Sequence, residues 1–255
     1  MEVDAPAMNP LLWNGRRRGP PPEGRGDGRA AGTGGSGLSG DPVGAIKRVL
    51  EEDIIFGRLR PRERLVEDAL MRRFGAKRHV VRQALAGLER IGIVTRERNK
   101  GAMVRDFALD EVEQIYAMRE LLQGHAARLI PLPANPALVE HLWEIHRQHA
   151  AAVARGNDLG AIYRLNNAFH DALFAACGNR YLAEAISHYA WLAHAIRSYR
   201  IADPVLLAQA RDEHGLMIEA LAAGDRERLV RLCVDHIKPS KEAYLAVRRV
   251  IEGAA

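Results

Sequence analysis

The chain has 255 residues, of which 47% are hydrophobic and 27% are charged, and its formal net charge is +5. This composition is typical of a soluble globular protein. The absence of any run of about 18 apolar residues excludes a membrane-spanning helix, and the first residues lack the apolar core of a secretory signal. We therefore expect a cytoplasmic protein whose two cysteines, Cys177 and Cys233, are reduced thiols.

The basic excess is confined to one segment. Residues 41–105 carry 16 Lys or Arg and 9 Asp or Glu, whereas residues 106–255 carry 16 and 19. Such a concentration favours a polyanionic partner at this end of the chain, although a solubilising surface charge explains it equally well.

Residues 1–40 are rich in Gly, Pro and Arg and have no periodic apolar residues, which predicts a disordered tail. Residues 41–105 then predict a domain with the order helix, helix, turn, helix, β-hairpin. Its first helix ends at Gly57, Gly75 separates two short helices, and the hairpin turns at residues 99–101.

The rest of the chain, residues 106–255, predicts an all-helical domain. Apolar residues recur at helical spacing between breaks rich in Gly, Pro, Asn and Asp. After a first helix that ends at Leu129, further helices are expected at about 136–155, 158–177, 180–200, 204–223 and 226–251. Pro239 should bend the last of them.

The helix after Gly75 has the pattern of a major-groove reader. Val81, Leu85 and Leu88 share one apolar face, which leaves a basic face exposed. Arginine forks suit guanine edges and phosphates, and the hairpin tip can follow an adjacent minor groove. The candidate DNA-binding residues are Lys77, Arg78, His79, Arg82, Gln83, Asn99, Lys100 and Gly101.

This segment resembles the winged helix-turn-helix domain of the GntR family of bacterial transcription regulators. The resemblance lies in GRLRPRERLVEDALMRRFG, RHVVRQALAGLERIGIV and NKGAMV. It implies that Arg78 and Arg82 contact DNA and that Gly101 is the wing glycine. Two positions depart from the family: Asp68 stands where some members have a further DNA-contacting arginine, and Lys77 replaces the usual serine.

Polar residues occupy apolar helix faces in the second domain. Asn166 and His170 stand one turn apart in RLNNAFHDAL, and His214 and His236 lie on the apolar stripes of two later helices. A shared divalent metal would satisfy all four. Core histidines bonded to carbonyl groups are the common alternative, and His146 shows the same placement, so the pattern alone does not select the ligands. The other histidines are interpreted as surface or structural residues: His125, His141, His149, His188 and His194.

Residues 109–248 resemble the FCD ligand-binding domain of the FadR-like branch of the same family. The resemblance lies in QIYAMRELLQGHAARL, NNAFHDALFAACGNRYL and RDEHGLMIEALAAGD. Its metal-binding members use an acid-x-x-x-His pair and two later histidines, which implies Asn166, His170, His214 and His236 as ligands. Because Asn166 replaces the usual aspartate, we expect weaker binding or another metal preference. Zinc is the first candidate, followed by nickel, manganese or iron.

The expected effector is a small organic acid. A metal held by neutral ligands would attract a carboxylate, and Arg119, beside an apolar stripe, can pair with it through a bidentate fork. A structural salt bridge explains Arg119 equally well.

The sequence therefore predicts a mostly α protein with a winged helix-turn-helix domain followed by an all-helical bundle. The expected function is a bacterial transcription regulator that binds double-stranded operator DNA as a homodimer, with repression as the commoner mode. Two rivals are a helical metalloenzyme with a basic accessory domain, and an architectural DNA-binding protein without an effector.

Overall fold

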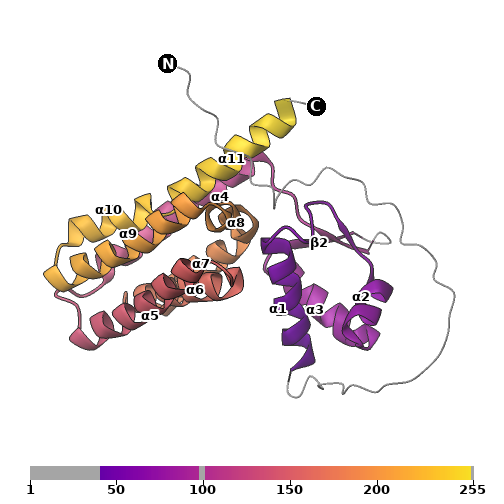
Figure 1. Cartoon of the computed structure of the whole chain (residues 1–255), viewed down its shortest axis with the longest axis horizontal. Coiled ribbons are helices and arrows are strands. Elements are labelled where there is room, and N and C mark those ends of the chain that lie inside the picture. The colour runs from indigo at the N-terminus through magenta and orange to yellow at the C-terminus, as the bar shows by residue number, and fades with distance from the viewer. Residues whose placement is uncertain (1–40, 98–100, 254–255) are drawn as a thin grey trace.

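The computed structural model describes residues 41–97 and 101–253. The predicted tail at 1–40 and the hairpin-tip residues Asn99 and Lys100 lie outside these ranges. The protein is mostly helical, as predicted, with a small N-terminal group of elements at one end and a helical bundle at the other (Figure 1). Within the described ranges, none of the helices combines the length and the apolar character that crossing a bilayer requires.

The N-terminal group contains the predicted helices and hairpin. Its elements are α1 (Pro42–Ile55), β1 (Arg64–Leu65), α2 (Glu67–Phe74), α3 (Arg78–Arg90), β2 (Val94–Glu97) and β3 (Gly101–Val104). The side chain of Asp41 caps α1 by accepting a hydrogen bond from the Gly44 N–H at 2.9 Å. Gly75 ends α2 with a φ of 59°, a left-handed conformation that glycine adopts without steric cost and that turns the chain into α3.

The three strands form an antiparallel sheet in the order β1-β3-β2. Strand β1 was not predicted, because two residues are too few to show an alternating pattern; it pairs Leu65 with Ala102 of β3. Val81 and Leu85 of α3 are fully buried against α1 and the sheet. The predicted apolar face of α3 is therefore its core face, and the opposite face is left for solvent.

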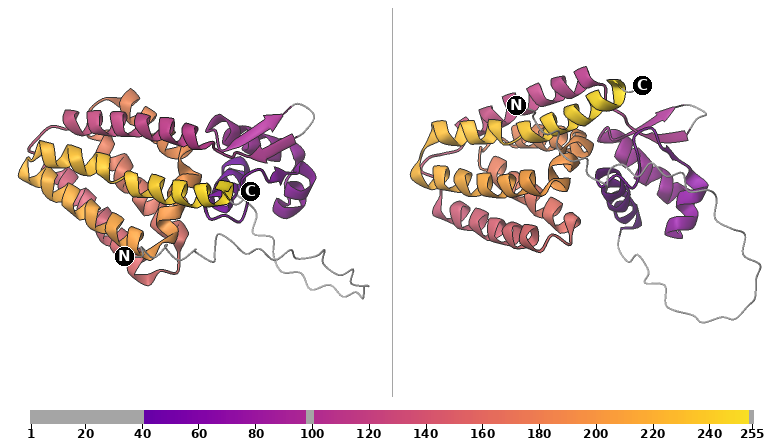
Figure 2. Two further views of the ribbon diagram at one scale, coloured as in Figure 1. Left: turned by 90° about the horizontal axis from the view of Figure 1, so that it is seen from above. Right: turned by 45° about the horizontal axis from the view of Figure 1, so that its top comes forward.

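Within residues 101–253, eight helices make up the bundle. They are α4 (Leu109–Leu129), α5 (Pro136–Arg155), α6 (Leu159–Ala175), α7 (Arg180–Leu192), α8 (His194–Ala202), α9 (Pro204–Ala223), α10 (Arg226–Asp235) and α11 (Lys238–Gly253). Phe169, Ile218 and Leu229 are fully buried in its main apolar core. Both views in Figure 2 show α11 extending from the bundle toward the N-terminal group.

Two long helices predicted in the bundle are each divided in the structure. The helix expected at 180–200 breaks at Ala193 into α7 and α8, where no glycine or proline signals a break. The helix expected at 226–251 ends at Asp235 rather than bending at Pro239, which lies in the first turn of α11. A proline ring clashes with the carbonyl four residues earlier, here that of Asp235, and lacks an N–H to bond it, which accounts for the interruption between α10 and α11.

The C-terminal end of α1 packs against the bundle. Ile55 shares an apolar cluster with Tyr163 of α6, and the Phe56 ring meets the Tyr163 ring edge-on with centroids 6.4 Å apart. The Lys47 ammonium lies 5.6 Å from the centroid of the Trp191 ring of α7. The N-terminal group is thus attached to the bundle through α1.

Candidate metal centre and DNA-reading face

Helix α3 presents a polar face to solvent. The sequence-predicted residues on this helix and its N-cap are all exposed: Lys77, Arg78, His79, Arg82 and Gln83. Gly101, at the start of β3, has a φ of 83°, which only glycine adopts readily, and its lack of a side chain lets the backbone of the wing approach a partner closely. Asn99 and Lys100 lie outside the described residues, so Gly101 is the only predicted DNA-binding residue of the wing that the described part of the chain includes.

Carboxylates of α2 already pair with the two arginines of this face. The Arg78 Nη2 donates to Asp68 Oδ1 at 2.6 Å. The Arg82 Nε donates to Glu67 Oε1 and Oε2 at 3.0 and 2.9 Å. The basic excess of this segment is therefore partly balanced at the face where DNA was expected.

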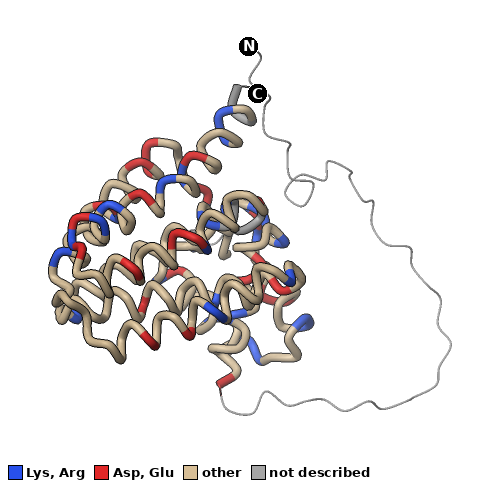
Figure 3. The backbone as a smooth tube through the Cα atoms, turned by 60° about the vertical axis from the view of Figure 1, so that its left-hand side comes forward, with Lys and Arg blue, Asp and Glu red and all other residues tan. Residues whose placement is uncertain are grey.

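In the bundle, acidic and basic residues are interspersed along the helices (Figure 3).

Three histidines from separate parts of the bundle converge on one point. His170 of α6, His214 of α9 and His236 at the C-cap of α10 each offer a nitrogen, and these nitrogens lie within 4.8 Å of one another. The Nε2 atoms of His170 and His236 are 3.1 Å apart. Neither ring nitrogen of His214 has a hydrogen-bond partner among the described residues. We call these three residues the histidine centre.

The histidine centre has the donor chemistry of a transition-metal site. Burial lowers the pKa of His170 and of His214 well below 6.5 and that of His236 to about 4, so the imidazoles are neutral at physiological pH. Neutral imidazole is the form that binds a metal ion. Unpartnered ring nitrogens in a buried site are costly unless a ligand satisfies them, so the residues present fit a divalent ion.

The fourth predicted ligand, Asn166, lies one turn before His170 on α6 and is half-buried. It lines a small cavity together with His149 and His236. His149, interpreted as surface or structural, is fully buried with its ring centroid 5.1 Å from that of His214. The buried stripe of α5 at 142, 145, 149 and 152 is a helical pattern that points His149 inward. His146, the other candidate, packs on Trp143 outside the centre.

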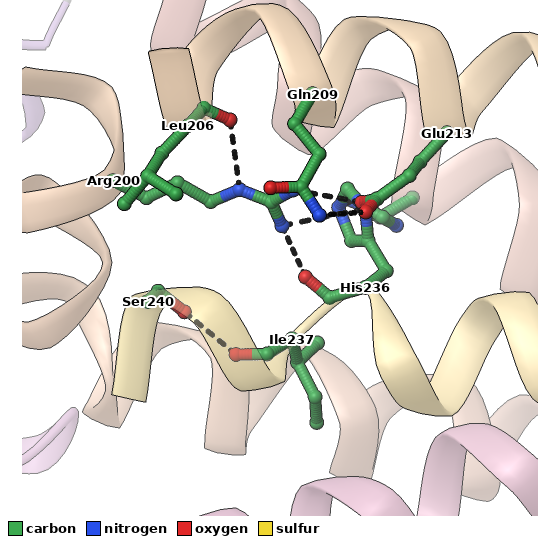
Figure 4. A network of polar contacts seen from close by, with 8 residues as sticks. Arg200, Leu206, Gln209, Glu213, His236, Ile237 and Ser240 are labelled. Carbon is green, nitrogen blue, oxygen red and sulfur yellow. Dashed lines mark hydrogen bonds and ion pairs between the residues drawn. The ribbon is translucent and has the colours of Figure 1, made fainter. Parts of the chain in front are cut away.

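A carboxylate orients one of the three histidines. Glu213 Oε2 accepts a hydrogen bond from the Nδ1 of His236 at 2.6 Å and from the Nη2 of Arg200 at 2.7 Å (Figure 4). Burial raises the pKa of Glu213, but the bond from His236 and the charge of Arg200 outweigh this and lower it to about 2. A proton held on Nδ1 leaves Nε2 of His236 free to face the other imidazoles.

Sequence reasoning missed both Glu213 and Arg200. Neighbouring residues on a helix point in different directions, so the position of Glu213 next to His214 in the sequence does not indicate a contact with the histidines. The partner of Glu213 is His236, 23 residues later. Arg200 also donates to the backbone carbonyl of His236, which ties α8 to the junction of α10 and α11 (Figure 4).

Arg119 is buried on α4, with 4% of its surface exposed. Its guanidinium stacks on Tyr116, and its Nε and Nη1 have no partner within the described part of the chain. Burial lowers its pKa to about 10, which leaves it charged at neutral pH. Arg119 shares a small cavity with His170, His194 and Arg197. Among the described residues no carboxylate pairs with it, which favours an incoming anion over the structural salt bridge.

The remaining histidines and both cysteines have structural or surface positions. His194 is buried, and its Nε2 lies 2.7 Å from the Tyr163 hydroxyl, so it is structural. His125, His141 and His188 in the bundle are exposed. Cys177 and Cys233 are both buried free thiols, and burial raises the pKa of Cys233 to about 12, which keeps it protonated.

Comparison with known proteins agrees with this arrangement. Residues 42–104 match the model of bacterial regulatory proteins of the gntR family, and residues 114–239 match the FCD domain. The chain is 28% identical over 148 residues to the HTH-type transcriptional regulator YdhC of Bacillus subtilis, covering 58% of this chain and 66% of that protein. It is 26% identical over 207 residues to the HTH-type transcriptional repressor GlaR of Escherichia coli, covering 74% and 90%.

A solved structure, E. coli McbR/YncC, shares the fold with a TM-score of 0.65 at 20% identity, covering 81% of this chain and 96% of that one. The two domain models match the two groups of elements described above, and the curated relatives are transcription regulators rather than enzymes. The chain therefore belongs to the GntR family of bacterial regulatory proteins, DNA-binding regulators of transcription, and carries an FCD domain.

Proposed function

We propose that this protein is a cytoplasmic, metal-dependent repressor whose homodimer binds a double-stranded DNA operator and leaves it when a small organic acid binds the FCD domain. The observation that carries the proposal is the convergence of three neutral imidazoles, two buried and that of His170 half-buried, next to Arg119, a buried cation without a counter-ion among the described residues. The repressor named among the relatives supports the sign of regulation.

The donor set suits a borderline divalent cation. Imidazole nitrogen favours zinc, with nickel, manganese or iron as alternatives. We assign His170, His214 and His236 as ligands, with Asn166 as a weaker oxygen donor. All four are uncharged, so the ion would keep its full positive charge and would attract an anionic group into its open coordination positions.

The cavity beside the histidine centre suits a small carboxylate. Arg119 contributes unpartnered donors, and Arg197, which is 9% exposed, donates to Asn167 Oδ1 at 2.7 Å. A guanidinium fork binds carboxylate through two parallel hydrogen bonds, and a buried cation gains most when an anion arrives. We therefore infer that the carboxylate of the effector lies between the histidine centre and Arg119.

The same cavity adjoins the attachment of the N-terminal group. Trp191 and His194 line the cavity. Trp191 lies under Lys47 of α1, and His194 bonds Tyr163, whose ring meets Phe56 at the end of α1. A ligand that prefers one position of these side chains shifts the orientation of the two N-terminal groups in the dimer. This shift changes the affinity of the dimer for the operator.

The proposal is tested by fluorescence anisotropy on an operator selected from random duplexes with the full chain. Binding should require zinc, fall after chelation, and weaken when one member of a panel of small organic acids is added. Operator affinity that is indifferent both to chelation and to every acid would contradict the sensing part of the proposal and leave an architectural DNA-binding protein.

Replacing Arg119 by methionine should make the protein insensitive to the effector. Hydrogen bonds to charged groups contribute about 1.5–3 kcal/mol, so the acid concentration needed for half-release from the operator should rise roughly 10- to 150-fold. Methionine keeps the apolar stem and removes a buried charge, so folding should survive. Arg155→Met, at an exposed arginine, is the control, and an unchanged acid response in Arg119→Met would contradict the assignment.

Replacing Glu213 by glutamine should weaken metal binding without abolishing it. The variant loses the anionic acceptor that holds His236, and such outer partners typically contribute about 10- to 100-fold in metal affinity. Affinity is measured by competition with a chelating dye, and circular dichroism verifies the fold. The control is Glu219→Gln, at an exposed acid on the same helix. Equal zinc affinity in the two variants would show that Glu213 does not support the metal site.

A further inference from the structure

Two acidic residues at the start of α2 face two arginines at the start of α3. Glu67 and Asp68 occupy the first turn of α2. Asp68 pairs with Arg78 at 2.6 Å, and Glu67 pairs with Arg82 at 2.9 Å. These are the arginines that we assign to DNA contacts. In the DNA-free protein each of them is therefore already paired with a carboxylate.

The pairs contribute little to the stability of the fold. About half of each arginine side chain is exposed, and so are 60% of Asp68 and 24% of Glu67. Exposed ion pairs are screened by water and salt. A carboxylate at the reading face also repels phosphates, which is a cost for a protein whose partner is a polyanion. A role in DNA recognition explains why the two ion pairs are present although they add little stability and their carboxylates repel phosphates.

The hydrogen bonds leave guanidinium donors for DNA. Glu67 binds Arg82 through Nε, and among the described residues no bond occupies its two terminal nitrogens. Those nitrogens form the end-on fork that matches guanine O6 and N7. Asp68 binds only one terminal nitrogen of Arg78. Both side chains are held at one edge while donors at another edge stay available.

We propose that Glu67 and Asp68 are specificity-determining residues of the DNA-reading face. They hold Arg82 and Arg78 in position for base edges and oppose their transfer to phosphates. On the operator, each arginine keeps its carboxylate and reads a base. On other sequences an arginine must leave its carboxylate to reach a phosphate, and the freed carboxylate then lies beside the DNA backbone. Binding to non-operator DNA is therefore penalised more than binding to the operator.

The test compares Asp68→Asn and Glu67→Gln with the full-length wild-type protein. Affinities for the selected operator and for a random duplex are measured by anisotropy over a range of KCl concentrations. Each variant should bind the random duplex more tightly, with a salt slope steeper by about one. Operator affinity should stay equal or fall, so that the ratio of the two affinities drops about tenfold.

The control is Glu140→Gln, which removes the same charge from an exposed acid of α5 paired with Arg147. Its affinity ratio should match that of the wild type. A ratio unchanged in both acid variants, whether because both affinities rise together or because neither moves, would overturn the proposal. The inference rests on the assignment of Arg78 and Arg82 to DNA, which direct replacement of the arginines tests separately.

Discussion

Replacing Arg78 and Arg82 together by methionine is expected to lower operator affinity by roughly 30-fold to 10⁴-fold. A bidentate arginine contact with a guanine is worth about 1–3 kcal/mol, and the expected range is the simple sum for two such contacts. Both side chains lie on the exposed face of α3 and have no role in its core, so the variant should fold normally. Anisotropy with the selected operator measures the loss, and thermal unfolding verifies the fold.

The matched control for the arginine pair is Arg147→Met. Arg147 of α5 is as exposed as Arg82, at 55%, and like Arg82 it pairs with glutamate. Since Arg147 lies in the bundle, its loss should leave operator affinity nearly unchanged. If the double variant bound the operator as tightly as Arg147→Met does, α3 would not be the recognition helix.

Replacing His214 by alanine is expected to abolish metal binding. His214 is fully buried and its ring nitrogens have no other partner in the described part of the chain, so its loss removes a ligand without a substitute. At a free zinc concentration 100-fold above the dissociation constant, the wild type should gain about 2.7 kcal/mol of stability. This corresponds to roughly 5–10 °C in melting temperature for a chain of this size, and the variant should gain none.

Two further variants separate metal binding from packing. The His214 ring stacks on Phe169 with centroids 4.1 Å apart, so His214→Phe keeps an aromatic ring there while removing the ligand. His188→Ala, at an exposed histidine of α7, should retain the full zinc-dependent stabilisation. Elemental analysis of the purified proteins provides an independent measure. Stoichiometric zinc in both His214 variants would show that the histidine centre does not hold the metal.

The local pattern of the sequence determined which face of each helix is buried. The apolar spacing of Val81 and Leu85 identified the core face of α3, and therefore the exposed basic face. His170, His214 and His236 each interrupt an apolar stripe, the resemblance to the FCD domain distinguishes them from His146, and all three converge in the structure. Helical periodicity reports burial because every third or fourth side chain shares one side of the helix.

Contacts between helices, and the breaks that depend on packing, were decided by the tertiary structure. The Glu213–His236 bond joins two helices, the break at Ala193 has no glycine or proline to announce it, and strand β1 exists only because β3 lies beside it. The helical periodicity of the sequence indicates that a side chain points inward. It does not indicate which side chain of another helix will contact it. His149 and Arg119 come from two different helices, and only the packing of the bundle places His149 beside His214 and Arg119 beside His170.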